Sequence, residues 1–230
     1  MDCNEVGFSP KNVDAICRIG SSTKASAGGA TRYVGEKGIG FKSVFKVADV
    51  VYVSSGHYTF KFDKQTPLGM IAPIWAEFPL ARRQGYTSFL LKLCKDCNQL
   101  ELTNELRTLD PRMLMFLRQL RQINILIDTE NPFTQTLSRM PDIVGPKATT
   151  VRLRQNNVVM RYIVIKHAVT QLPLEPKRAG ICDSEIMLAF PIHQNQEPLL
   201  ASQQVYAFLP IRDYGFQVRI LSSKLQETSC

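Results

Sequence analysis

The sequence predicts an α/β protein: a two-layer α/β sandwich with helices over one face of a mixed, mostly antiparallel sheet, followed by a β-rich segment. Three observations predict this order. A short capped helix comes first, two stretches of alternating apolar residues follow, and several more such stretches lie beyond residue 150. We expect a domain over residues 1–128, a linker over 129–150 and a partial β-rich second domain over 151–230.

The first predicted helix occupies PKNVDAICRI, residues 10–19. Ser9 is placed to cap it and Pro10 suits the first helical position, while Val13 and Ile16 begin an apolar face. Residues 20–34 are rich in Gly, Ser, Ala and Thr and have no apolar period. They therefore predict a surface loop.

The stretch GEKGIGFKS, residues 35–43, places three glycines within six positions. Its spacing excludes a Walker A loop, because Phe41 separates the last glycine from the lysine. It also differs from a Rossmann turn, because the glycines follow the order G-x-x-G-x-G. Converging backbone N–H groups could still bind an anion here, with a turn that only packs a helix against a sheet as the alternative. We expect Gly35, Gly38 and Gly40 to border the main concave pocket.

Further elements follow the glycines. FKSVFKVA, residues 41–48, predicts a helix, and DPRMLMFLRQLRQ, residues 110–122, predicts a longer one capped by Asp110. Residues 129–150 hold three prolines and little apolar period, which predicts the linker. Strands are predicted where apolar residues alternate, at residues 49–55, 57–63, 86–93, 123–128, 150–169, 184–192, 203–211 and 215–220.

Composition limits the classes of function. The formal net charge of +8 favours an anionic partner such as a nucleotide, a nucleic acid or an acidic lipid surface. No signal peptide and no apolar run long enough to span a membrane is present, so we expect an intracellular protein, cytoplasmic or nuclear. The six cysteines lack a disulfide framework, and the one C-x-x-C, Cys94 to Cys97, has no second ligand pair for zinc. We predict no metal site and no catalytic residue.

Several motifs stand in an order that resembles a known family. NEVGF at residues 4–8, the capped helix, a Ser-Thr-Lys loop and GEKGIGFKSVFKVADVVYVSS at residues 35–55 together resemble the Bergerat fold of the GHKL ATPases, which include gyrase, heat-shock protein 90, histidine kinases and MutL. More specifically, the chain is similar to the sacsin and NO VEIN-like group. The resemblance covers residues 1–128, and AFLPIRDYGF at residues 207–216 also resembles that group.

The resemblance implies roles for individual residues. Gly7 would support the adenine with Phe8 beside the base, and Thr87 would help to hold the base from the sheet. Lys24 would lie at the start of a lid over residues 20–37, close to the phosphates. The glycine-rich stretch would supply backbone donors to the triphosphate. The nucleotide-binding residues implied are Asp2, Glu5, Gly7, Phe8, Lys24, Gly35, Lys37, Gly38, Ile39, Gly40, Phe41 and Thr87.

Two departures from the family matter. Many relatives carry an aspartate four residues before the equivalent of Gly7, where this chain has Cys3, so Asp2 is our candidate for the adenine contact, with Glu5 behind it. The family also carries its general-base glutamate and Mg²⁺-binding asparagine on a helix upstream of this motif. That helix is absent from this sequence, which we expect to be truncated at both ends and impaired in hydrolysis.

The sequence therefore predicts the ATP-binding domain of a chaperone-like ATPase that closes a lid over ATP or ADP, with Mg²⁺ as the counter-ion of the nucleotide. Its partners would include protein clients or partner domains. The alternatives are a non-catalytic remnant and a basic nucleic-acid-binding module. Only net charge favours nucleic acid, so we do not expect it as a partner.

Overall fold

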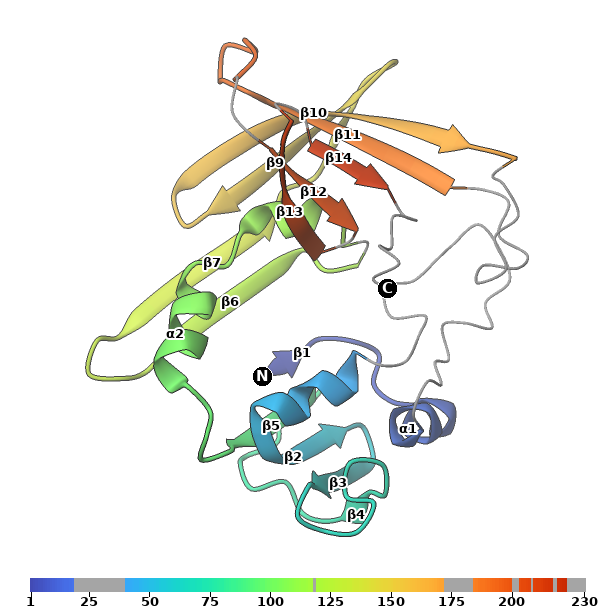
Figure 1. Ribbon diagram of the computed structural model, residues 1–230, viewed down its shortest axis with the longest axis vertical. Helices are drawn as coiled ribbons and strands as arrows, with labels where there is room; N and C mark the ends of the chain where they lie inside the picture. Colours follow the sequence, from blue (N-terminus) through green and yellow to red (C-terminus); the bar gives the residue numbers. More distant parts are fainter. Residues whose placement is uncertain are drawn as a thin grey trace. The chain divides into compact units, whose positions relative to one another are not determined.

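The computed structural model describes residues 1–18, 40–117, 119–171 and 184–199, together with the backbone of 203–207, 209–216 and 219–222. The chain divides by its internal contacts into two compact units, Met1–Gln99 and Leu100–Cys230 (Figure 1). Each unit is built on its own sheet, and almost all of the described strand pairs are antiparallel. The protein is thus a mixed α/β chain with two largely antiparallel sheets and few helices.

The first unit contains a sheet in the order β1-β5-β2-β3-β4. Apolar residues at every second position of its central strands, such as Val51 and Val53, are fully buried on one face. Side chains of α1 and η1 pack against the same cluster. The elements of this unit are β1 (Asp2–Cys3), α1 (Pro10–Cys17), η1 (Phe41–Lys46), β2 (Ala48–Ser55), β3 (Tyr58–Asp63), β4 (Ile74–Trp75) and β5 (Thr87–Leu93).

The helix α1 confirms the cap predicted from the sequence. Ser9 is the N-cap, and its side chain accepts from the backbone N–H of Asn12, whose own side chain accepts from the N–H of Ser9. Pro10 occupies the first turn. The cap matters for the site because it fixes the direction in which the chain leaves Gly7 and Phe8.

The stretch after the glycines is the 3₁₀ helix η1 rather than an α-helix. The N–H of Ser43 donates to the carbonyl of Gly40, and the N–H of Val47 donates to that of Val44. Because β2 begins at Ala48, only six residues are available, and a run this short favours the tighter helix. Phe45 is buried, so the predicted apolar face is present despite the different helix type.

The second unit contains a sheet in the order β13-β12-β14-β11-β10-β9-β7-β6, with β8 paired to β9. Its elements are α2 (Gln99–Arg107), which begins at the boundary, η2 (Pro111–Met115), β6 (Gln122–Ile127), β7 (Phe133–Arg139), β8 (Ile143–Val144), β9 (Thr149–Gln155), β10 (Val158–Val169), β11 (Ser184–Ile192), β12 (Gln203–Ala207), β13 (Leu209–Phe216) and β14 (Arg219–Ser222).

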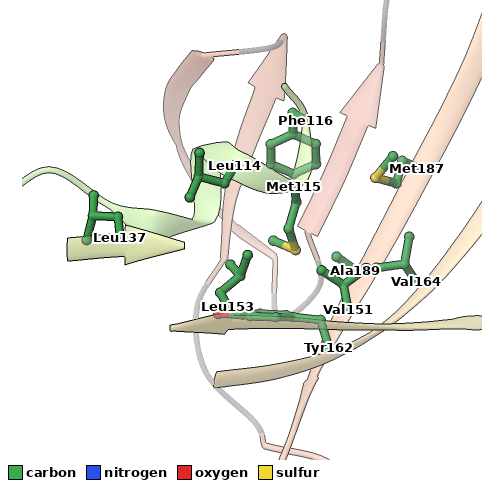
Figure 2. Close-up of a cluster of buried hydrophobic side chains, with 10 residues drawn as sticks. All are labelled: Leu114, Met115, Phe116, Leu137, Val151, Leu153, Tyr162, Val164, Met187 and Ala189. Carbon is green, nitrogen blue, oxygen red and sulfur yellow. The ribbon is translucent and has the colours of Figure 1, made fainter. Parts of the chain in front are cut away.

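The core of the second unit lies between η2 and one face of its sheet (Figure 2). Leu114, Met115 and Phe116 are all buried although they are consecutive, whereas an α-helix would turn only a stripe of its surface to the core. The predicted helix over residues 110–122 is accordingly a short 3₁₀ helix, still capped by Asp110. The core cluster consists of Leu114, Met115, Phe116, Leu137, Val151, Leu153, Tyr162, Val164, Met187 and Ala189.

Residues 129–150 differ from the predicted linker. They contain β7 and β8, and β7 pairs with β6 and β9 inside the second sheet. The strand was missed because polar Thr and Gln residues occupy its alternating positions, and even the covered position Gln135 is polar. The boundary between the units falls at Gln99, within the stretch predicted as a single domain.

Candidate functional site

The candidate nucleotide site lies in the first unit, where several of the predicted residues come together. Five of the predicted residues fall outside the described ranges, so their roles stay predictions. These five are Lys24, Gly35, Lys37, Gly38 and Ile39. The predicted lid over residues 20–37 also lies outside the described ranges.

A chain of hydrogen bonds joins the start of α1 to the sheet. The backbone N–H of Phe8 donates to Oγ of Ser55 at 2.8 Å, and this oxygen lies 2.6 Å from Oγ1 of Thr87. Ser55 and Thr87 are both completely buried. Two hydroxyl groups are therefore held where β2 ends and β5 begins, next to the loop that carries Gly7.

Gly7 has the backbone conformation that glycine is suited to. Its φ is +88°, in the left-handed region that side chains disfavour. A Cβ at this position would be 3.6 Å from Oγ of Ser55, so the space itself is ordinary and the constraint comes from the backbone. Gly7 thus permits the turn that brings the N–H of Phe8 to Ser55.

The register of β1 separates Asp2 from Thr87. Asp2 is opposite Ser88 and Cys3 is opposite Thr87, and side chains alternate between the two faces of a sheet. Oγ of Ser88 donates to Oδ1 of Asp2 at 2.6 Å, which fixes the carboxylate on the face away from Thr87. The structure therefore places Cys3, and not Asp2, on the face that carries Thr87.

The thiol of Cys3 and the carboxylate of Glu5 lie close to this region. Burial, and to a lesser degree the negative charge of Glu5, raises the pKa of the Cys3 thiol, which favours its neutral form. Glu5 itself is exposed. The face that carries Thr87 thus has a thiol at the position where many members of the resembled family carry an aspartate.

Gly40 and Phe41, the two predicted site residues of the glycine-rich stretch that the structure describes, are placed differently from each other. Gly40 is exposed, and nothing within 4 Å would meet a Cβ there. The ring of Phe41 instead packs among aromatic rings, 5.6 Å from Phe62 and 6.2 Å from Phe89 between centroids. Phe8 is also in contact with Phe89, at 6.5 Å. Phe8 and Phe41, two of the residues that the resemblance implies for nucleotide binding, therefore both pack against Phe89.

Sequence reasoning missed Lys42, which links three parts of this unit. Its Nζ donates to the carbonyl of Ile16 at 2.7 Å and to that of Met70, and it lies 4.7 Å from the centroid of the Phe62 ring. Burial lowers the pKa of Lys42, because the charged form loses hydration. Lys42 therefore connects α1 to the loop after β3.

A surface cavity of about 730 Å³ lies beside β4 and is lined by residues that include Trp75, Phe78 and Arg82. The expectation that Gly35, Gly38 and Gly40 border the main concave pocket stays a prediction. Within the described ranges, no helix is long and apolar enough to cross a membrane.

Comparison with known proteins gives one curated relative. The chain is 29% identical over 241 residues to Protein NO VEIN of Arabidopsis thaliana. The alignment covers 93% of this chain but 8% of that protein, so the chain spans a small part of its relative's length. No protein-family model and no solved structure matches the chain. The similarity to NO VEIN agrees with the resemblance seen in the motifs.

Proposed function

We propose that the first unit binds ATP between the helix-covered face of its sheet and the glycine-rich stretch, in the manner of a Bergerat-fold domain. The observation that carries the proposal is the hydrogen-bonded chain from Phe8 through Ser55 to Thr87, next to Gly7 at positive φ. Burying two hydroxyl groups costs free energy unless they are hydrogen-bonded, and each of these has a partner.

The chemistry of the site suits an adenine base. Adenine needs a few fixed donors and acceptors inside an apolar slot, and hydroxyl groups supply both. Ser55 and Thr87 are the polar groups, and Phe8 and Phe89 supply apolar surface. The triphosphate is expected at the glycine-rich stretch that ends at Gly40, with Lys24 and Lys37 as cations and Mg²⁺ as the counter-ion.

The register of β1 changes the residues that we assign to the base. We place Cys3 beside Thr87 in the adenine site and leave Asp2 out, because Asp2 is bonded to Ser88 on the opposite face. Glu5, which is exposed, is also left out. A thiol is a weak donor, so binding of the base would depend mainly on the two hydroxyl groups.

The test compares two neighbouring residues on opposite faces of β5. Calorimetric titration with Mg–ATP should give at least tenfold weaker binding for Thr87→Val, since a buried contact to the base is lost. Ser88→Ala, a matched control at a residue that is also buried, should bind within about twofold of the wild type, well under the 1.4 kcal/mol that a tenfold change represents. Thermal melting of both variants separates lost binding from lost folding.

Two results would overturn the proposal. One is undetectable binding of Mg–ATP by the folded wild-type chain. The other is equal affinity for ATP in the wild type and Thr87→Val. A second pair of variants tests the phosphate end: Gly38→Val should abolish binding by placing a branched side chain against the triphosphate, while Cys94→Ser should leave it unchanged.

A further inference from the structure

Three arginines lie on the outer face of the second sheet, the face turned away from the core cluster. Val151 and Leu153 are buried in that core, so Arg152, between them in β9, and Arg154 point to the opposite face. Tyr162 of β10 is buried too, and this places its neighbour Arg161 on the outer face. The pairing of β9 with β10 thus gathers three cations from two adjacent strands.

The arrangement of these arginines is costly for the protein alone. Arg152 and Arg161 are directly opposite each other in the ladder, and like charges at such positions destabilise a sheet. Among the described residues, none of the three forms an ion pair. Nε of Arg152 is buried without a hydrogen-bond partner, although Nη2 of the same side chain donates to the carbonyl of Pro141. An anion on this face would relieve the repulsion.

The rest of the outer face supplies neutral donors and apolar surface. Ser138 of β7 is opposite Arg154, and Gln122 of β6 is opposite Ser138. A hydroxyl group and an amide group therefore lie beside the arginines on the same face of the sheet. Along the other edge of β10, Ile163 is opposite Phe190 of β11. An apolar strip therefore borders the arginines. It consists of Ile163, Ile165, Leu188 and Phe190.

We propose that this outer face binds single-stranded nucleic acid, with phosphates on Arg152, Arg154 and Arg161 and bases on the apolar strip. Arginine, serine and glutamine side chains are common donors to phosphate oxygens. Arg152 and Arg154 are about 6.6 Å apart along their strand, a spacing that successive phosphates of an extended strand can match. The adjacent apolar strip, which includes one aromatic ring, suits exposed bases and not a duplex or a purely acidic peptide.

This inference does not depend on ATP binding by the first unit. It is tested with the full 230-residue chain and a fluorescent single-stranded DNA oligonucleotide of mixed sequence, by fluorescence anisotropy at several salt concentrations. Each phosphate contact adds about −0.7 to the slope of log affinity against log salt, so three arginines should contribute about −2. Poly-glutamate and a duplex of the same sequence serve as competitors and should displace the strand poorly.

The decisive variant replaces Arg152, Arg154 and Arg161 together by glutamine. We expect at least tenfold weaker binding near 50 mM salt and a slope reduced by about 2. The matched control removes the same charge from exposed positions of the first unit, with Lys11, Lys46 and Lys95 replaced by glutamine, and should change affinity by less than threefold.

Three outcomes would overturn the proposal. Equal losses in the two triple variants would show that binding follows net charge alone. Stronger competition by poly-glutamate would show that the partner is an acidic protein, and absence of binding at low salt would show that the face is no nucleic-acid site. The triple variant loses a like-charge pair, so its melting temperature should not fall. If it nevertheless unfolds, the single variant Arg161→Gln tests the proposal with a smaller change.

Discussion

The two sheets differ in the face that carries the residues of their proposed sites, which is the covered face in the first unit and the outer face in the second. In the first unit, Ser55 and Thr87 are buried on the face that α1 and η1 also contact. In the second unit the covered face is mainly apolar, although it also carries Gln135 and Arg139, and Arg152 and Arg154 lie on the outer face.

Our two proposals assign a different ligand to each sheet. We propose the buried hydroxyl groups of Ser55 and Thr87, which hydrogen-bond to each other, for the base of a nucleotide. We propose the arginines of the outer face, which form no ion pair among the described residues, for an extended anion. Both polar sets lie on regular strands, so the pairing register alone decides which face each residue occupies.

The largest effects on stability are expected from substitutions in the two hydrophobic cores. Phe62→Ala removes a fully buried ring of the first unit and should lower its free energy of unfolding by about 3–5 kcal/mol. Leu153→Ala should cost the second unit about 2–5 kcal/mol. Trp75, the single tryptophan, lies in the first unit, so its fluorescence in a urea titration should shift for Phe62→Ala only. An equal shift for Leu153→Ala would show that the units unfold together.

The register of β1 gives a gain-of-function prediction. Cys3→Asp places a carboxylate on the Thr87 face, where it can accept from the amino group of adenine, and should tighten ATP binding about tenfold, or 1.4 kcal/mol. Asp2→Asn, one residue away on the opposite face, should leave the affinity unchanged. Weaker ATP binding by Asp2→Asn in calorimetry would show that Asp2 belongs to the adenine site.

The cap of α1 should have a smaller effect. Ser9→Ala removes the acceptor for the N–H of Asn12 and should lower the stability of the first unit by about 1 kcal/mol. Because the cap orients the chain after Phe8, ATP binding should weaken as well, whereas oligonucleotide binding should not. Thermal melting and the two binding assays check these expectations. A loss of oligonucleotide binding would show that the units are coupled.

The smallest effect concerns thiol reactivity. Burial raises the pKa of Cys17, so its thiolate fraction near pH 8 is lower than in the unfolded chain. Alkylation by iodoacetamide, followed by mass spectrometry, should be slower for native Cys17 than for the denatured protein. A raised native pKa stabilises the fold below the unfolded pKa, and this contribution is lost as pH rises through the native one. Equally fast alkylation would contradict the burial of this thiol.

Local patterns predicted much of the fold, and the resemblance named part of the candidate site. The cap at Ser9, the strands β2 and β3 and the cap at Asp110 follow from short-range rules, and the structure confirms them. The helix α2 was missed because it buries no residue and so has no apolar face to recognise. The strand β1 has only two residues, too few for a pattern.

The site was harder to predict because it depends on register. Thr87 could be named from its motif, but its partner Ser55 stands 32 positions away and only the pairing of β2 with β5 brings the two together. Arg152 and Arg161 are likewise brought together by strand pairing, because the turn between β9 and β10 places them directly opposite each other. A shift of one residue would reverse the face of each side chain.

The most direct test of the contrast between the sheets is a crossed binding experiment. Mg–ATP and the labelled oligonucleotide are titrated into the wild type, Thr87→Val and the triple arginine variant. We predict that Thr87→Val loses ATP and keeps the oligonucleotide, that the arginine variant does the reverse, and that saturating ATP does not displace the oligonucleotide. Loss of ATP binding in the folded arginine variant, or unchanged ATP binding in Thr87→Val, would contradict the account.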